Sequence, residues 1–154
     1  MDGVLNCRYT ERLIFSFLFV SPEKIELLKQ LVEHTGARIV LSSTWRYGWA
    51  DIETGKDDTT DAKCFLALKT ELQNYGLELL DYTPVTSDDM YQRGTEIEMW
   101  LNAWKGESIE SFVILDDLNG RYLRPHAGKL VQTSMSKGLQ QVHIEKAIKL
   151  LNKT

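Results

Sequence analysis

A chain of 154 residues, 43% of them hydrophobic and 26% charged, is long enough for one globular domain with a substantial core. The formal net charge of −4 argues against a general electrostatic grip on nucleic acid, although it leaves room for a local basic site. Cys7 and Cys64 lack the spacing of metal ligands and are typical of two reduced thiols. The one long apolar run, residues 13–20, is far shorter than the roughly 20 residues that cross a bilayer. We therefore expect a soluble cytoplasmic protein without a membrane partner.

The first elements alternate between strand and helix. Residues 13–20 (LIFSFLFV) have the aromatic and β-branched content of a buried strand. Ser21-Pro22-Glu23 then supplies an N-cap, a proline at the first helical position and an acidic first turn, and Gly36 ends the predicted helix. Residues 37–41 (ARIVL) predict a short apolar strand that runs into Ser42-Ser43.

The middle of the chain contains a polar stretch and a second helix. Residues 47–60 carry two glycines and several aspartates, which predicts a long loop. A helix follows with Phe65, Leu68 and Leu72 on one face, and Gly76 ends it. Residues 77–82 are expected to form another strand.

The last part repeats the alternation. The pattern predicts a helix over residues 96–104, an apolar strand over 112–115 (FVIL), a last strand over 129–133 and a closing helix over 139–151. Short, continuously apolar strands that alternate with helices indicate an α/β fold, a parallel sheet with helices on both faces. Ligands of such sheets bind beyond the carboxyl ends of the strands.

Polar side chains gather at those strand ends. Asp116 and Asp117 follow FVIL directly, and two adjacent carboxylates repel each other unless a cation such as Mg²⁺ lies between them. A solvated acidic loop is the equally simple alternative. Ser42 and Ser43 could face a phosphate or merely cap a turn. Arg93 precedes a helix whose N-terminus would also favour an anion.

Aromatic residues follow the two serines. Trp45 could stack on a nucleobase while Arg46 pairs with a phosphate, which would make both substrate-binding residues. The alternative is that Trp45 and Trp49 pack this segment onto the sheet.

Four segments in this order, MDGVLN, ARIVLSSTWR, RGTEIEMWL and FVILDD, resemble the haloacid dehalogenase-like (HAD) phosphohydrolase superfamily. They are most similar to the small HAD domains of Swiss Army Knife RNA repair proteins. Receiver domains also use an acidic pair and a hydroxyl on an α/β sheet, but there the acidic pair comes early and the hydroxyl late.

The resemblance implies a HAD-like Rossmannoid fold over residues 1–154 and a role for each landmark. Asp2 would be the acid/base, Ser42 and Ser43 would bind the phosphoryl group, and Arg93 would stabilise the transferring charge. Asp116 and Asp117 would hold Mg²⁺, with the backbone carbonyl of Asp2 as a further ligand. The nucleophilic aspartate would be the residue before Met1.

The central strand of such a sheet would also lie before Met1. Losing its buried apolar residues would remove on the order of 10 kcal/mol of stability. We therefore expect either that the true start lies upstream, or that residues 13–20 fill the central place. Within residues 7–20, the other interpretation is a flap over the active site.

The resulting hypothesis is a Mg²⁺-dependent phosphomonoesterase that acts through an aspartyl-phosphate on a nucleotide, a polynucleotide end or another phosphate ester. That activity belongs to the complete form, and the 154-residue chain is expected to be inactive because it lacks the nucleophile. The alternative is a non-catalytic degenerate HAD domain that binds phosphate or a protein partner.

Overall fold

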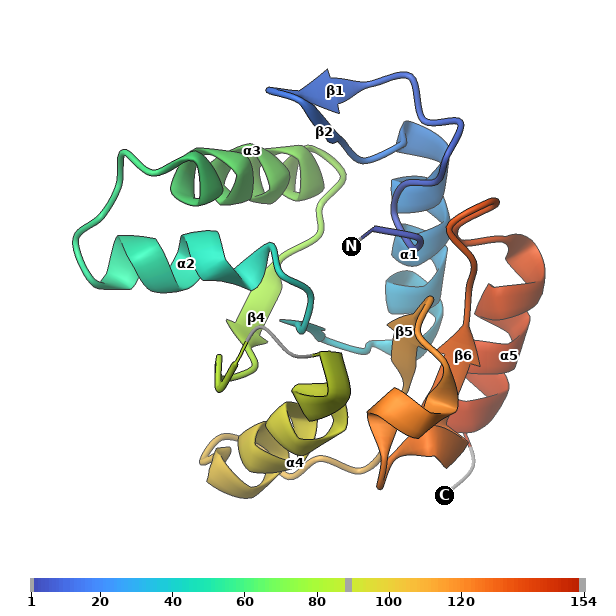
Figure 1. Cartoon of the computed structure of the whole chain (residues 1–154). Coiled ribbons are helices and arrows are strands. Elements are labelled where there is room, and N and C mark those ends of the chain that lie inside the picture. Colours follow the sequence, from blue (N-terminus) through green and yellow to red (C-terminus); the bar gives the residue numbers. More distant parts are fainter. Residues whose placement is uncertain (1, 88–89, 153–154) are drawn as a thin grey trace.

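The computed structural model describes residues 2–87 and 90–152, and within them it has helices packed around three two-stranded sheets (Figure 1). The strands are β1 Leu13–Ile14, β2 Phe17–Leu18, β3 Ile39–Leu41, β4 Leu79–Tyr82, β5 Ile114–Asp116 and β6 Leu130–Gln132. The α-helices are α1 Pro22–Thr35, α2 Arg46–Glu53, α3 Thr60–Asn74, α4 Arg93–Ala103 and α5 Gln141–Leu151. β3 pairs with β4 and β5 with β6, both in parallel. The predicted α/β class is confirmed.

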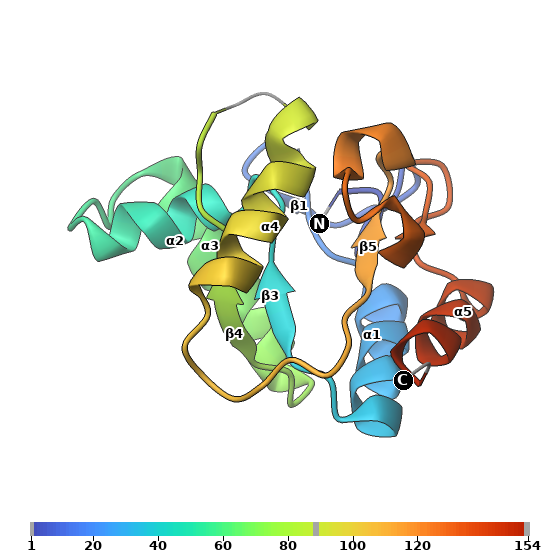
Figure 2. The same cartoon turned by 90° about the horizontal axis from the view of Figure 1, so that it is seen from below.

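The first helix forms where its caps predict it. α1 begins at Pro22, and Gly36 ends it in the left-handed region at φ 68°, which glycine adopts without a Cβ clash. Ile25, Leu28 and Leu31 are buried on one face. α1 and α5 lie side by side (Figures 1 and 2). The apolar stripe predicted from the sequence is therefore part of the main core.

The prediction of a long loop over residues 47–60 is wrong, because α2 occupies Arg46–Glu53. Gly48, which suggested a loop, instead permits two helices to approach closely: a Cβ on it would lie 2.0 Å from the backbone oxygen of Asp61 at the start of α3. Trp49 stacks on Phe65 with 5.0 Å between ring centroids. The packing of α2 against α3 therefore outweighs the low helix propensity of glycine at position 48.

Replacing Gly48 with alanine should lower the free energy of unfolding by about 1–3 kcal/mol, because the added methyl group forces α2 and α3 apart. Gly128→Ala is the matched control, since nothing lies within 4 Å of its Cβ position. Its effect should stay within about 0.5 kcal/mol. Urea unfolding of both variants checks this, and equal losses would contradict the close-approach explanation.

The prediction of one buried strand over residues 13–20 is wrong too. The segment folds into the β1–β2 hairpin, which Phe15 turns with φ 52°. Leu13, Phe15 and Phe17 are exposed, so the hairpin presents apolar side chains to solvent. The hairpin lies away from β3 and β5, and it does not fill the space between them (Figure 1).

The two parallel pairs remain separate. Within the described residues no strand joins β3 to β5. α4 lies on one side of the space between them and α1 on the other (Figure 2). Over residues 2–87 and 90–152, no helix is long and apolar enough to span a bilayer. The site described next lies where β3 and β5 face each other.

Candidate functional site

A cavity of about 500 Å³ lies between β3 and β5 and extends past their carboxyl ends. Residues predicted from four separate segments of the chain line this one cavity. They are Asp2, Ser42, Ser43, Arg46, Arg93, Asp116 and Asp117. Trp45 is the one predicted site residue that is not part of its wall.

The loop that carries Asp2 is organised by Asn6, whose side chain is fully buried. Its Nδ2 donates to Asp2 Oδ1 at 2.7 Å and to the Leu18 carbonyl at 3.1 Å, while its Oδ1 accepts from the Gly3 backbone N–H at 3.0 Å. One amide therefore ties the acidic loop to the β1–β2 hairpin and fixes the direction of the Asp2 carboxylate.

Gly3 brings the same loop against the acidic pair. It has φ 67°, and a Cβ on it would lie 2.6 Å from Asp117 Oδ2. Both features favour glycine, because any side chain would be strained and would overlap the carboxylate. The backbone next to Asp2 and the Asp117 carboxylate are thus held together.

The two adjacent aspartates have different partners. Asp116 Oδ2 accepts from Arg93 Nη1 at 3.0 Å, and its Oδ1 accepts from the Leu118 backbone N–H at 3.0 Å. Burial raises the pKa of the Asp117 carboxyl, and the negative charge of Asp116 raises it further. Arg93 therefore compensates one carboxylate, and the other lies in an environment that a cation would relieve.

The donor set fits Mg²⁺. Within the described residues no three acidic, His or Cys side chains converge as a complete metal cage. Mg²⁺ does not require one, because it binds through one or two carboxylates and keeps water or phosphate oxygens as its other ligands. Asp116 and Asp117 supply hard oxygen donors, and Gly3, which follows Asp2 in the chain, lies against the Asp117 side chain.

Hydroxyl groups occupy the opposite wall, at the end of β3. Thr83 Oγ1 donates to Ser42 Oγ at 3.5 Å. Ser43 Oγ is buried and, among the described residues, has no hydrogen-bond partner. A buried hydroxyl without a partner costs stability unless something else satisfies it. An oxyanion in the cavity would do so.

Arg46 is held by the protein itself. Its Nη2 pairs with Glu96 Oε2 at 2.6 Å, its Nη1 donates to the Ser42 carbonyl at 2.7 Å, and both side chains of the ion pair are 2% exposed. Glu96 Oε1 also accepts from the Thr86 backbone N–H at 2.9 Å. Burial lowers the pKa of the Arg46 guanidinium, and Glu96 opposes that shift. Contact between Arg46 and a substrate stays a prediction.

Trp45 lies against the core. Its ring centroid is 6.2 Å from that of Phe19. Trp49 likewise packs between Phe65 and Tyr82. These contacts match the packing alternative, and stacking of Trp45 on a nucleobase stays a prediction.

Sequence reasoning missed Asn6 and Glu96. Asn6 belongs to the MDGVLN segment. An amide side chain four residues after Asp2 was the available signal that this loop is held by a side-chain hydrogen bond. Nothing in the local pattern marks Glu96, because spacing along the chain does not reveal a partner 50 positions away.

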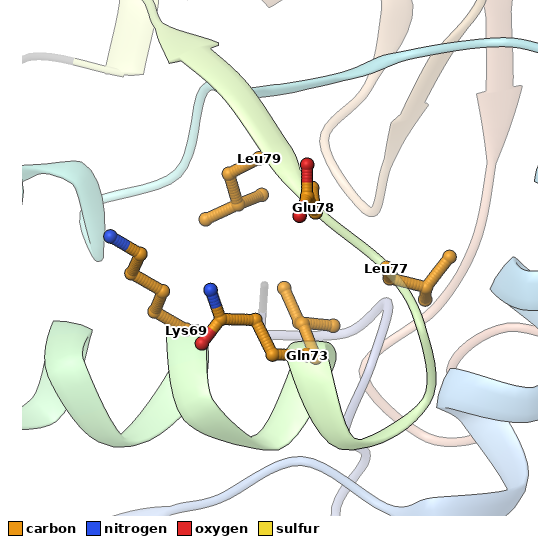
Figure 3. Close-up of a pocket in the computed structure, with 6 residues that line it drawn as sticks. Lys69, Gln73, Leu77, Glu78 and Leu79 are labelled. Atoms are coloured by element: carbon orange, nitrogen blue, oxygen red, sulfur yellow. The ribbon is translucent and has the colours of Figure 1, made fainter.

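A second hollow, of about 240 Å³, lies elsewhere on the molecule (Figure 3). Lys69 and Gln73 of α3 line it, together with Glu78 and with Leu79 at the start of β4. It contains none of the predicted site residues. We therefore assign the site to the cavity between β3 and β5.

Comparison with known protein families agrees with the geometry. The family model described as the HAD domain in Swiss Army Knife RNA repair proteins matches residues 1–144. The chain belongs to this HAD family. A search of the curated proteins and a search of the solved structures each returned no match. Membership of the HAD family indicates a phosphohydrolase type of function.

Proposed function

We propose that this HAD domain, completed by a carboxylate nucleophile ahead of Met1, is a Mg²⁺-dependent phosphomonoesterase. The observation that carries this proposal is the convergence of Asp2, Ser42, Arg93 and the Asp116–Asp117 pair on one cavity. A carboxylate nucleophile, an acid/base, hydroxyl and guanidinium donors and a cation site are the parts that covalent phosphoryl transfer requires.

The extended domain would act in two steps. The nucleophilic carboxylate forms a bond to phosphorus while the bond to the leaving oxygen breaks, and Asp2 gives that oxygen a proton. Asp2 then takes a proton from water, whose oxygen displaces the carboxylate and releases inorganic phosphate. Ser42, Ser43 and Arg93 would hold the phosphoryl oxygens. Mg²⁺ bound by Asp116 and Asp117 would neutralise their charge.

The proposed substrate is a nucleotide or a polynucleotide end. The family's description as a domain of RNA repair proteins supports this class. The net charge of −4 is compatible with contact at a terminal phosphate, whereas a long duplex contact would call for an extended basic surface. Two free cysteines among the described residues support the further proposal of a cytoplasmic protein.

The 154-residue chain itself is proposed to bind phosphate without turnover. Four carboxylates line the cavity, and three of them already have a partner: Asp2 is held by Asn6, Asp116 by Arg93 and Glu96 by Arg46. Asp117 is assigned to the cation, so none of the four carboxylates that the described residues contribute to this cavity is free to act as the nucleophile. This arrangement also supports the second candidate, a non-catalytic phosphate-binding module.

Release of phosphate distinguishes the two candidates. A chain extended before Met1 by an apolar strand ending in Asp should release phosphate from 5′- and 3′-phosphorylated oligonucleotides when Mg²⁺ is present. Asp116→Asn should reduce that rate at least about 100-fold, because it removes a cation ligand and a partner of Arg93. Asp58→Asn, in an exposed position, is the matched control and should leave the rate unchanged.

An extended chain that binds Mg²⁺ and phosphate but releases none would favour the binding module. Equal rates for Asp116→Asn and Asp58→Asn would contradict the proposed site.

A further inference from the structure

We propose that the ring pair Tyr91–Tyr122, together with Arg121, forms a nucleotide subsite beside the cavity. The rings would stack on the base next to the terminal phosphate of the substrate, and Arg121 would bind the following phosphate. The ligand is then the end of a single-stranded polynucleotide and not a mononucleotide. This inference rests on the proposed function, because it places the terminal phosphate in the cavity between β3 and β5.

The two segments that carry the tyrosines leave the wall of the cavity. Arg93 lines the cavity as the first residue of α4, and Tyr91 lies two residues earlier, in a 3-10 turn. Leu118 also lines the cavity, and Tyr122 follows it by four residues, in a second 3-10 turn. Two residues span at most about 7 Å, so Tyr91 lies close to Arg93. The second turn and the start of α4 lie side by side (Figures 1 and 2).

Three features hold these segments together. Arg93 Nη1 pairs with Asp116 Oδ2 at 3.0 Å. Gly94 permits a close approach, because a Cβ on it would lie 2.0 Å from the backbone oxygen of Arg124. Leu123 is fully buried and anchors the second turn. The backbone beneath both rings is therefore fixed by the core and by an ion pair of the candidate site itself.

The two rings differ in how they are held. The guanidinium carbon of Arg121 lies 4.8 Å from the ring centroid of Tyr122, and its Nη2 donates to the Tyr122 hydroxyl at 2.7 Å. Tyr91 packs against Tyr122 with 4.7 Å between ring centroids and 56° between ring planes. Tyr91 is 60% exposed, so much of this residue remains accessible to a ligand.

An exposed ring and a cation match the chemistry of single-stranded nucleic acid. Bases of any sequence stack on aromatic side chains, while arginine and lysine contact the phosphates between them. Arg121 is exposed, and among the described residues no carboxylate pairs with it. A phosphotyrosine peptide would use the rings but leave the guanidinium without a phosphate. The position of Arg121 therefore favours a polynucleotide.

The test measures binding to the 154-residue chain by calorimetry in the presence of Mg²⁺. The probes are diadenylates with a 5′- or a 3′-terminal phosphate, each with a counterpart that lacks the base next to that phosphate. Loss of this base should weaken binding about 10- to 100-fold. Tyr91→Leu should cause the same loss for the intact probe and change the affinity of the abasic probe by less than about 2-fold. A purely structural role of Tyr91 would weaken both probes equally.

Matched variants separate the ring from the charge. Tyr91→Phe keeps the ring and should retain the affinity. Tyr9→Leu removes another exposed tyrosine, which is 76% exposed, and should leave binding unchanged. Arg121→Gln should weaken binding of the diadenylate and reduce the slope of its salt dependence by about one. Adenosine monophosphate lacks the second phosphate, so its affinity should not respond to Arg121→Gln.

A second measurement needs no variant. In the complex with the intact diadenylate, short interproton contacts should join the base next to the terminal phosphate to the Tyr91 ring. Equal affinities for the intact and abasic probes, equal losses for Tyr9→Leu and Tyr91→Leu, no binding of either diadenylate, or tighter binding of a phosphotyrosine peptide would each overturn the proposal.

These outcomes are distinct from failure of the proposed function. A chain that binds inorganic phosphate but does not distinguish intact from abasic probes would retain the proposed function and reject the nucleotide subsite. Base-dependent binding through Tyr91, in a domain whose extended form releases no phosphate, would retain the subsite and reject the phosphatase.

Discussion

Replacing Glu96 with alanine is expected to lower the free energy of unfolding by about 3–5 kcal/mol, because the variant leaves the Arg46 guanidinium buried and unpaired. The side chains of Arg46 and Glu96 are each only 2% exposed, so the guanidinium would lose its carboxylate partner in a largely desolvated position. The free energy of unfolding of a typical domain is about 5–15 kcal/mol, so this one substitution would remove a large part of the stability. Urea unfolding of the 154-residue chain measures the loss.

Two further variants show whether burial is the cause. Glu107 forms an exposed ion pair with Arg38 at 4.0 Å, and Glu107→Ala should cost less than about 1 kcal/mol. The double variant Arg46→Met with Glu96→Leu removes both charges and should recover most of the stability lost by Glu96→Ala. Similar losses for Glu96→Ala and Glu107→Ala would show that the buried ion pair contributes no more to the free energy of unfolding than the exposed pair does.

Local signals in the sequence were sufficient for much of the fold. Pro22 and Gly36 bracket α1 because both residues restrict the backbone in ways that need no tertiary partner. The apolar run before Asp116 forms β5 because a buried parallel strand needs apolar residues on both faces. The carboxyl ends of β3 and β5 also meet at one cavity, as strand direction predicts.

Tertiary contacts decided the rest. Gly48 favours a loop by propensity, but its missing Cβ permits the close contact between α2 and Asp61. The apolar residues of 13–20 resemble a core strand, yet the turn at Phe15 folds them back as a hairpin. The first outcome depends on Asp61, which lies in a separate segment at the start of α3, and the second depends on a left-handed turn at Phe15 that hydrophobic spacing does not reveal.

The candidate site, like the fold, could be predicted from the sequence only in part. Acidic and hydroxyl residues at strand ends were visible in the sequence, whereas the residues that hold them were not. Asn6 fixes Asp2, and Glu96 fixes Arg46 next to the carbonyl of Ser42. The amino-acid sequence does not distinguish an exposed charged residue on a helix from a member of a buried ion pair. Arg46 was therefore predicted to bind the substrate, and its partner Glu96 was not recognised.

The second large effect concerns Asp2, in a chain extended by an apolar strand ending in Asp. Asp2→Asn should lower the rate of phosphate release from an alkyl phosphate by about 100- to 10,000-fold, because the leaving alkoxide then receives no proton. The substitution nearly preserves the shape of the side chain. Its amide can still meet Asn6, which holds the Asp2 carboxylate at 2.7 Å.

The leaving group separates proton transfer from a structural role. p-Nitrophenyl phosphate releases a phenoxide that is stable without a proton, so Asp2→Asn should slow its first step far less than that of the alkyl ester. A single-turnover measurement isolates that step from the later attack of water, for which Asp2 is the proposed base. Equal losses for both esters would mean that Asp2 shapes the loop and transfers no proton. A loss confined to the poor leaving group requires a proton donor at this position, and Asn6 and Gly3 are then the residues that aim it.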